Sequence, residues 1–127
     1  MPAPRPPDLD GLRVLVVEDS FLIADLITEE LQDAGCSVVG PASRVKEGLA
    51  LANAEPLDGA LLDVNLAGEF CFPIAEALAA KGVPFVFLTG YGDAGLPSAF
   101  RQMPRLEKPF DTGELMKLVG GNFTKAS

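Results

Sequence analysis

The chain has 127 residues and a formal net charge of −8, with 10 Lys and Arg against 18 Asp and Glu. This length predicts a single domain, and a hydrophobic fraction of 48% is enough for a packed core. The acidity argues against nucleic-acid binding, because phosphate backbones bind basic surfaces. No apolar run is long enough for a membrane span or a signal-peptide core, so we expect a cytoplasmic protein.

Histidine is absent from the sequence. This excludes Ser-His-Asp and Cys-His nucleophile pairs, His-ligated zinc and a phosphohistidine carrier. Cys36 and Cys71 are predicted to be buried thiols rather than a disulfide. Carboxylates, hydroxyls, lysines and the backbone remain as the groups that can carry chemistry.

The predicted elements alternate between strands and helices along the chain. A proline-rich leader over 1–10 comes first, then a valine-rich strand over 12–17. Apolar residues at helical spacing follow, and Gly35 ends that helix. The members of this helical stripe are Ile23, Leu26, Ile27, Leu31 and Ala34.

Further strands are predicted at 37–39, 59–63 and 84–88 and around Leu106, and helices at 43–53, 72–80 and 112–119. Glycines and prolines interrupt 90–104, so the fourth helix is expected to be short or irregular, with about one turn over 98–103. The alternation predicts an α/β fold with a doubly wound, five-stranded parallel sheet. We expect the domain to occupy 11–120 and a tail 121–127.

Polar side chains gather where the predicted strands end, which is where ligands bind in a doubly wound sheet. These residues are Glu18 and Asp19 after the first strand, Asp63 at the end of the third, Thr89 after the fourth and Lys108 after the fifth. Clustered carboxylates repel one another unless a cation neutralises them, and an all-oxygen site suits Mg²⁺. A carboxylate nucleophile, a metal, a lysine and a hydroxyl together describe a site that accepts a phosphoryl group.

Each of these residues also has an ordinary structural explanation. The pair Asp19-Ser20 is typical of a helix cap, and Asp63 precedes a turn. Thr89-Gly90 is a common strand exit, and a lysine before proline is usually solvated. Only their joint placement at strand ends favours a site.

The segments VLVVEDS, LLDVNL, FLTGY and EKPF together resemble the receiver domain of two-component response regulators, over residues 11–120. The resemblance implies a flavodoxin-like (βα)5 fold with Asp63 as phosphoacceptor. It implies that Glu18, Asp19, Asp63 and the backbone carbonyl of Asn65 bind Mg²⁺. It also implies that Thr89 contacts the phosphoryl group, that Lys108 pairs with it, and that the bond from Lys108 to Pro109 is cis.

A narrower resemblance is carried by PFVFLTGY at 84–91, which is similar to the PFxFxTGY motif of the stand-alone "FAT GUY" receivers, with Leu88 in place of their usual alanine. Arg105 stands where receivers usually carry a switch aromatic. Tyr91 is therefore a candidate for part of the switch role, or else a rim aromatic without coupling.

Phe21 and Leu22 lie off the apolar stripe of the first helix, beside the acidic pair. They form either a docking surface for kinases and phosphotransfer proteins or a contact with the loop that holds Pro109 and Phe110.

We therefore expect a single-domain response regulator in a two-component phosphorelay. It would take a phosphoryl group from the phosphohistidine of a sensor histidine kinase or phosphotransfer protein, with Mg²⁺, and signal by protein contact or onward phosphotransfer. It is not expected to be an enzyme beyond its own phosphorylation and dephosphorylation, and we expect a monomer or weak dimer. The analogy extends to stress signalling.

Two other classes stay open. One is a Mg²⁺-dependent phosphohydrolase with an Asp nucleophile, which usually places a second acid two residues later, where this chain has Asn65. The other is a pseudo-receiver that binds partners without phosphorylation, and the complete set of acidic, hydroxyl and lysine residues argues against it.

Overall fold

The computed structural model describes residues 9–90 and 96–125, so Tyr91 lies outside the described residues. Five parallel strands form one sheet in the order β2-β1-β3-β6-β7. The strands are β1 (Arg13–Val17), β2 (Ser37–Ala42), β3 (Gly59–Asp63), β6 (Phe85–Thr89) and β7 (Arg105–Glu107). This arrangement confirms the predicted doubly wound α/β fold.

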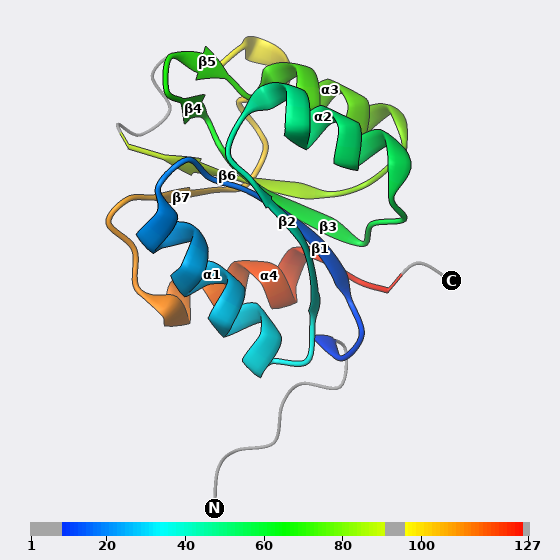
Figure 1. Cartoon of the computed structure of the whole chain (residues 1–127), viewed down its shortest axis with the longest axis vertical. Coiled ribbons are helices and arrows are strands. Elements are labelled where there is room, and N and C mark those ends of the chain that lie inside the picture. The colour runs from blue at the N-terminus through cyan, green and yellow to red at the C-terminus, as the bar shows by residue number, and fades with distance from the viewer. Residues whose placement is uncertain (1–8, 91–95, 126–127) are drawn as a thin grey trace, which may run out of the picture.

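Helices cover both faces of the sheet (Figure 1). On one face lie α1 (Phe21–Asp33) and α4 (Thr112–Asn122), and on the other lie α2 (Val45–Ala54) and α3 (Phe72–Ala80). Successive strand residues point to opposite faces, so β1 sends Val14 and Val16 into the core under α1 and α4. Its residues Leu15 and Val17 enter the core under α2 and α3.

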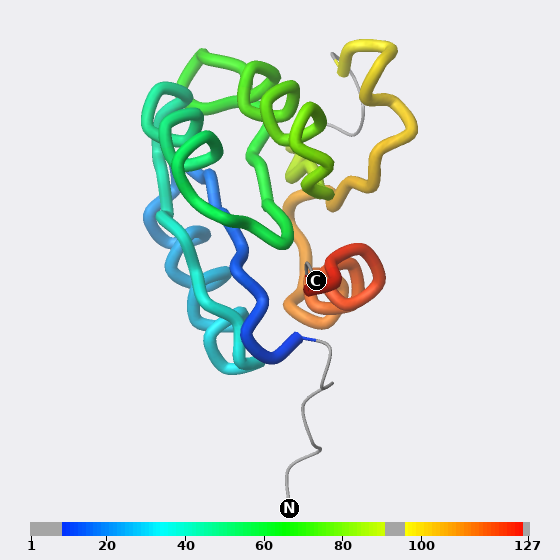
Figure 2. Tube along the Cα trace, turned by 90° about the vertical axis from the view of Figure 1, so that its right-hand side faces the viewer, coloured from blue at the N-terminus to red at the C-terminus, as the bar shows by residue number. Residues whose placement is uncertain are grey.

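In the described part of the stretch between β6 and β7, residues 96–104, the helical structure is one 3₁₀ turn, η2 (Ser98–Phe100), which agrees with the turn expected over 98–103. This turn lies beyond the sheet on the side of α3, separate from α4 (Figure 2). Phe100 covers the sheet here, with its ring centroid 5.7 Å from that of Phe87 and 6.0 Å from those of Phe72 and Phe85. Phe100 therefore belongs to an aromatic cluster with Phe72, Phe85 and Phe87.

Three local expectations were wrong. Strand β2 runs to Ala42 instead of ending at residue 39, because its pairing with β1 resumes after an irregularity at Gly40, and α2 begins at Val45 instead of residue 43. Leu26 is 41% exposed, and Ala24 lies on the buried face of α1 in its place. A small antiparallel hairpin, β4 (Asn65–Leu66) and β5 (Glu69–Phe70), was not predicted.

The packed unit extends past both expected boundaries. Leu9 is buried although it was assigned to the leader, and α4 continues through Gly120 and Gly121 to Asn122. Phe123 is fully buried against Gly59, where an added Cβ would lie 2.4 Å from the Phe123 ring. The boundaries at 11 and 120 therefore cut through the core.

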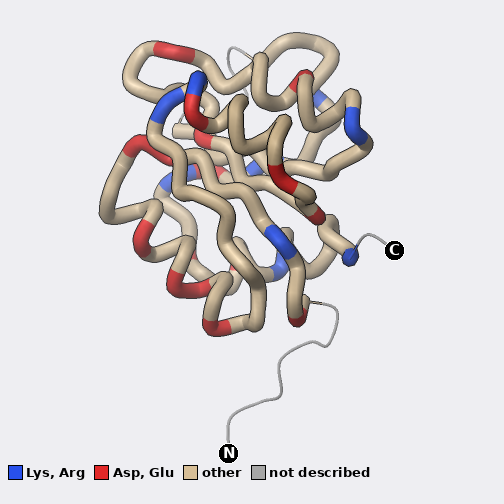
Figure 3. Tube along the Cα trace, turned by 45° about the vertical axis from the view of Figure 1, so that its right-hand side comes forward, with Lys and Arg blue, Asp and Glu red and all other residues tan. Residues whose placement is uncertain are grey.

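Acidic positions are spread over helices and loops around the molecule (Figure 3). Most of the net charge thus belongs to the general surface. Among the described residues, no helix has both the length and the apolar character needed to cross a membrane.

Candidate functional site

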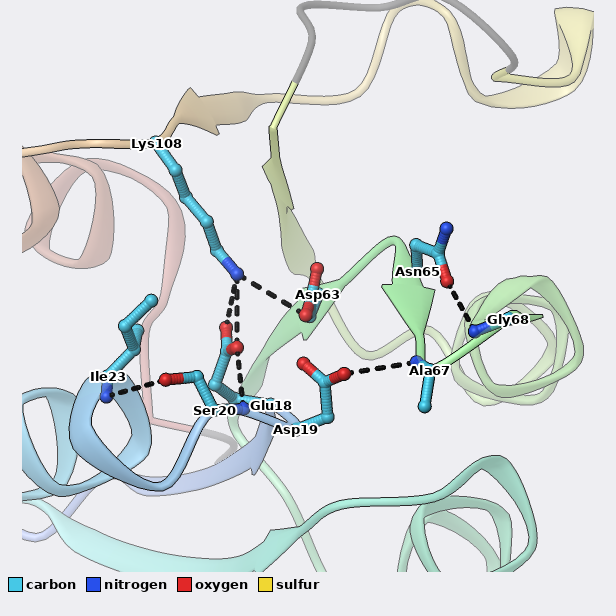
Figure 4. Close-up of polar contacts among 9 residues, drawn as sticks. All are labelled: Glu18, Asp19, Ser20, Ile23, Asp63, Asn65, Ala67, Gly68 and Lys108. Carbon is cyan, nitrogen blue, oxygen red and sulfur yellow. Dashed lines mark hydrogen bonds and ion pairs between the residues drawn. The ribbon is translucent and has the colours of Figure 1, made fainter.

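The strand ends bring the predicted polar residues to one edge of the sheet (Figure 4). Asp63 is the last residue of β3 and pairs with Leu88 of β6, so Thr89 follows at the same edge. Glu18 follows β1, and its backbone N–H donates to the Ala42 carbonyl at 2.9 Å. Glu18, Asp63 and Thr89 are buried, although strand ends are usually exposed to solvent.

Three carboxylates form a tight cluster at this edge. One oxygen each from Glu18, Asp19 and Asp63 lies within 4.8 Å of the others. Lys108, carried by the chain after β7, places Nζ 2.8 Å from Glu18 Oε2, 3.0 Å from Glu18 Oε1 and 3.3 Å from Asp63 Oδ2. Lys108 thus neutralises part of the cluster.

The surroundings raise the pKa of both Asp63 and Lys108, which favours the neutral form of Asp63 and the charged form of Lys108. Burial, and then the charge of Glu18, raise the pKa of Asp63 from 3.8 to about 7, although Lys108 opposes this rise. Burial disfavours the charged form of Lys108, but its hydrogen bonds and charge interactions with Glu18 and Asp63 outweigh burial and raise its pKa. Lys108 therefore stays charged, but its charge does not fully offset the burial of Asp63 and the repulsion from Glu18.

The sequence left open whether the pair Asp19-Ser20 caps a helix or contributes to a metal site, and the two residues take one role each. Ser20 is the N-cap of α1, and its hydroxyl accepts a hydrogen bond from the Ile23 N–H at 3.4 Å. The Asp19 carboxylate is not used in the cap and instead accepts the Ala67 N–H at 3.0 Å. Asp19 is therefore available to the cluster.

The residues present fit a hard divalent cation. The donors are carboxylate oxygens, which Mg²⁺ prefers, and they converge from separate segments. Glu18 Oε2 and Thr89 Oγ1 are buried without a hydrogen-bond partner, although Glu18 Oε2 is ion-paired to Lys108. The buried Thr89 hydroxyl, which has no partner, suits a pocket that takes a phosphoryl group beside the cation.

Other predicted site residues occupy different surroundings. Asn65 is exposed on β4, where its side-chain oxygen accepts the Gly68 N–H at 2.8 Å. The peptide bond from Lys108 to the exposed Pro109 is cis. Arg105 is half-buried on β7, and its guanidinium donates to the Arg101 carbonyl. Tyr91 cannot be placed, because it lies outside the described residues.

Phe21 and Leu22 are each 79% exposed at the start of α1. This exposure contradicts the alternative in which they pack against the loop of Pro109 and Phe110. A cleft beside them is lined in part by Phe21, Asp25 and Pro41, and it reaches Asp19.

Sequence reasoning missed Ala67, which contacts Asp19 from the β4–β5 hairpin. The signal was weak: Gly68 marks a turn, but each flanking strand has only two residues. The two cysteines behave as expected, because both are free and buried. Burial, with a contribution from the charge of Asp63, raises the pKa of Cys71 to about 12.

The fold, with this acidic cluster and lysine at the strand ends, defines a receiver-class α/β domain. Residues 14–120 match the response regulator receiver domain family. The chain therefore belongs to that family.

Known relatives agree with this assignment. The chain is 31% identical over 111 residues to the transcriptional regulatory protein PdtaR of Mycobacterium tuberculosis, covering 84% of this chain and 54% of PdtaR. It thus spans about half the length of this curated relative. SdrG from Sphingomonas melonis Fr1 is a similar solved structure, with 40% identity, a TM-score of 0.77 and coverage of 87% and 94%. The response regulator PhyR from Brucella abortus has 28% identity, a TM-score of 0.68 and coverage of 87% and 52%.

Proposed function

We propose that this chain accepts a phosphoryl group on Asp63 from a phosphohistidine in a two-component phosphorelay and signals in that state. The observation that carries the proposal is the convergence of Glu18, Asp19, Asp63 and Lys108 beside a buried, unpartnered Thr89 hydroxyl. Phosphoryl transfer depends mainly on positioning and on charge neutralisation, and these residues supply both. The expected cytoplasmic location belongs to the same proposal.

The transfer would begin with Asp63 in its ionised form. An Asp63 oxygen attacks phosphorus, the bond from phosphorus to the histidine nitrogen breaks, and the electron pair stays on the donor histidine. Bound Mg²⁺ would supply positive charge for the phosphoryl oxygens, held by Glu18, Asp19, Asp63 and the Asn65 carbonyl. Lys108 and the Thr89 hydroxyl would bind the transferred group. Attack by water on phosphorus later releases inorganic phosphate and regenerates the Asp63 carboxylate.

The direct test is labelling with acetyl phosphate and with phosphorylated histidine donors, with Mg²⁺ or with EDTA. We expect Mg²⁺-dependent incorporation of one acid-stable, base-labile phosphoryl group per chain. Asp63→Asn should abolish labelling, whereas Asp33→Asn, at the exposed end of α1, should label normally. Equal labelling of the Asp63→Asn variant would refute the assignment.

The partner proposal is a sensor histidine kinase or a phosphotransfer protein that contacts the start of α1. Phe21 and Leu22 form an exposed apolar pair beside the acidic cluster, and large apolar side chains in such positions support protein docking. In the phosphorylated state we propose output by protein contact or by onward phosphotransfer. Profiling against the histidine kinases and phosphotransfer proteins of the host would identify the donor.

The narrower "FAT GUY" assignment and a role in stress signalling are also proposals. They rest on the PFVFLTGY segment and on the likeness to SdrG, for which a BeF3-activated conformation has also been solved, and to PhyR. A similar PhyR from Bartonella quintana, 26% identical, is called an anti-anti-sigma factor. Turnover of small phosphomonoesters by this chain would instead favour a phosphohydrolase.

A further inference from the structure

The β4–β5 hairpin contacts the acidic cluster through one hydrogen bond. The Ala67 N–H, at the tip of the hairpin, donates to Asp19 Oδ2 at 3.0 Å. Asp19 is exposed, whereas Glu18 and Asp63 are buried and paired with Lys108. In Figure 4 the Asp19 side chain extends between Asp63 and Ala67, on the side of the cluster away from Lys108.

The hairpin holds this N–H donor in a fixed place. Its turn is closed by the bond from the Gly68 N–H to Asn65 Oδ1 at 2.8 Å. Its base is closed by the bond from the Cys71 N–H to the Val64 carbonyl at 2.9 Å. Leu66 anchors the hairpin in the core, where it is 1% exposed.

A backbone N–H suits this place for an electrostatic reason. An exposed carboxylate rotates freely, and ordering it toward two other carboxylates is unfavourable. A hydrogen bond to one oxygen fixes the carboxylate plane and leaves the second oxygen of Asp19 free for a cation. Because the donor carries no net charge, it does not compete with the cation, as a second lysine would.

We propose that the β4–β5 hairpin is a positioning element for Mg²⁺, with the Ala67 N–H orienting Asp19 toward the cation. The inference rests on the proposed function, since Mg²⁺ binding is part of it. Groups that hydrogen-bond to metal ligands commonly change metal affinity by 10–100-fold when they are lost. Ala67 acts through Asp19 and is a positioning residue.

The backbone of the turn provides clean perturbations. Ala67 and Gly68 both have positive φ, +52° and +95°, and L side chains disfavour that region. An added Cβ at Gly68 meets nothing within 4 Å, so Gly68→Ala strains the turn without a clash or the loss of a polar group. Gly82, which follows α3, has φ +73° and equally open surroundings. Gly82→Ala is therefore a matched control away from the cluster.

The experiment measures the Kd for Mg²⁺ of the full chain by isothermal titration calorimetry at pH 8. We expect Gly68→Ala to raise the Kd about threefold or more. Ala67→Pro removes the N–H and also distorts the turn, because proline cannot adopt φ +52°, and it should raise the Kd about tenfold. Ala67→Gly keeps the donor and relieves the positive φ, so it should bind at least as tightly as wild type. Gly82→Ala should lose stability but keep the wild-type Kd.

Backbone NMR supplies a second readout. Addition of Mg²⁺ should leave the Ala67 amide protected from exchange in the wild type, and Gly68→Ala should reduce that protection. Wild-type Kd values in both Gly68→Ala and Ala67→Pro would overturn the proposal. Tighter binding in either variant would also overturn it, because the hairpin would then compete with the cation. If the wild type bound no Mg²⁺, the metal requirement of the proposed function would fail as well, which is a distinguishable result.

Discussion

Replacing Asp63 with Asn should change how the stability of the ion-free protein depends on pH. Asp63 has a pKa of about 7 in the folded protein, raised from 3.8 by burial and by the charge of Glu18. Between these values the folded state keeps a proton that the unfolded state has released. The stabilisation from this group is therefore complete below pH 4 and is lost as the pH rises through 7.

The size of the effect follows from the two pKa values. At about 1.4 kcal/mol per pH unit, a rise from 3.8 to about 7 corresponds to about 4 kcal/mol of unfolding free energy. Asp63→Asn keeps the shape of the side chain and has no proton to lose. Part of this stabilisation is already lost at pH 4.5. The unfolding free energy of Asp63→Asn, relative to wild type in EDTA, should therefore increase by about 3 kcal/mol between pH 4.5 and pH 8.

Urea unfolding followed by far-ultraviolet circular dichroism over this pH range would measure the difference, because the chain lacks Trp. Glu76→Gln, at an exposed position of α3, is the control and should track the wild type at every pH. Saturating Mg²⁺ at pH 8 should stabilise the wild type more than Asp63→Asn and narrow the gap. A difference between Asp63→Asn and wild type that stays constant across the range would refute the charge-repulsion argument.

Three further substitutions test separate features. Gly59→Ala would force a Cβ into the ring of Phe123 and should lower the unfolding free energy by about 1–3 kcal/mol, measured by urea unfolding; an unchanged value would contradict that packing. Thr89→Val removes a buried hydroxyl without a partner, so the unfolding free energy should hold or rise by about 1 kcal/mol in urea unfolding. A clear loss of stability would reveal a bond to that hydroxyl. Phe21→Ser should alter stability by less than about 0.5 kcal/mol but slow phosphotransfer from a cognate donor about tenfold in stopped-flow assays, and wild-type rates would exclude docking there.

The sequence was sufficient for the sheet and for most of the cluster, for one physical reason. Buried parallel strands are short apolar runs, so each polar residue at the end of a run is visible, as with Asp63 after Gly59–Leu62. Parallel topology then brings those ends together without any knowledge of the loops. Glu18, Thr89 and Lys108 were found in this way.

The sequence did not show the contacts made by loops and by the C-terminal end. The β4–β5 strands are too short for an alternating pattern, so the bond from Ala67 to Asp19 left no signal. Gly120 and Gly121 look like the end of a helix, yet tertiary packing carries α4 past them because burial of Phe123 outweighs the low helix propensity of glycine. The exposure of Leu26 likewise depends on the angle at which α1 packs, which its spacing does not specify.

The contact between Phe123 and Gly59 separates two kinds of experiment on this molecule. Gly59 begins β3 and Asp63 ends it, and these two residues are about 13 Å apart at about 3.3 Å per residue. The Phe123 ring and the acidic cluster therefore lie at opposite ends of one strand. A fluorophore or isotopic label placed near Phe123 can therefore report global unfolding without entering the cation site. The global stability of the chain and its phosphoryl chemistry can thus be varied independently.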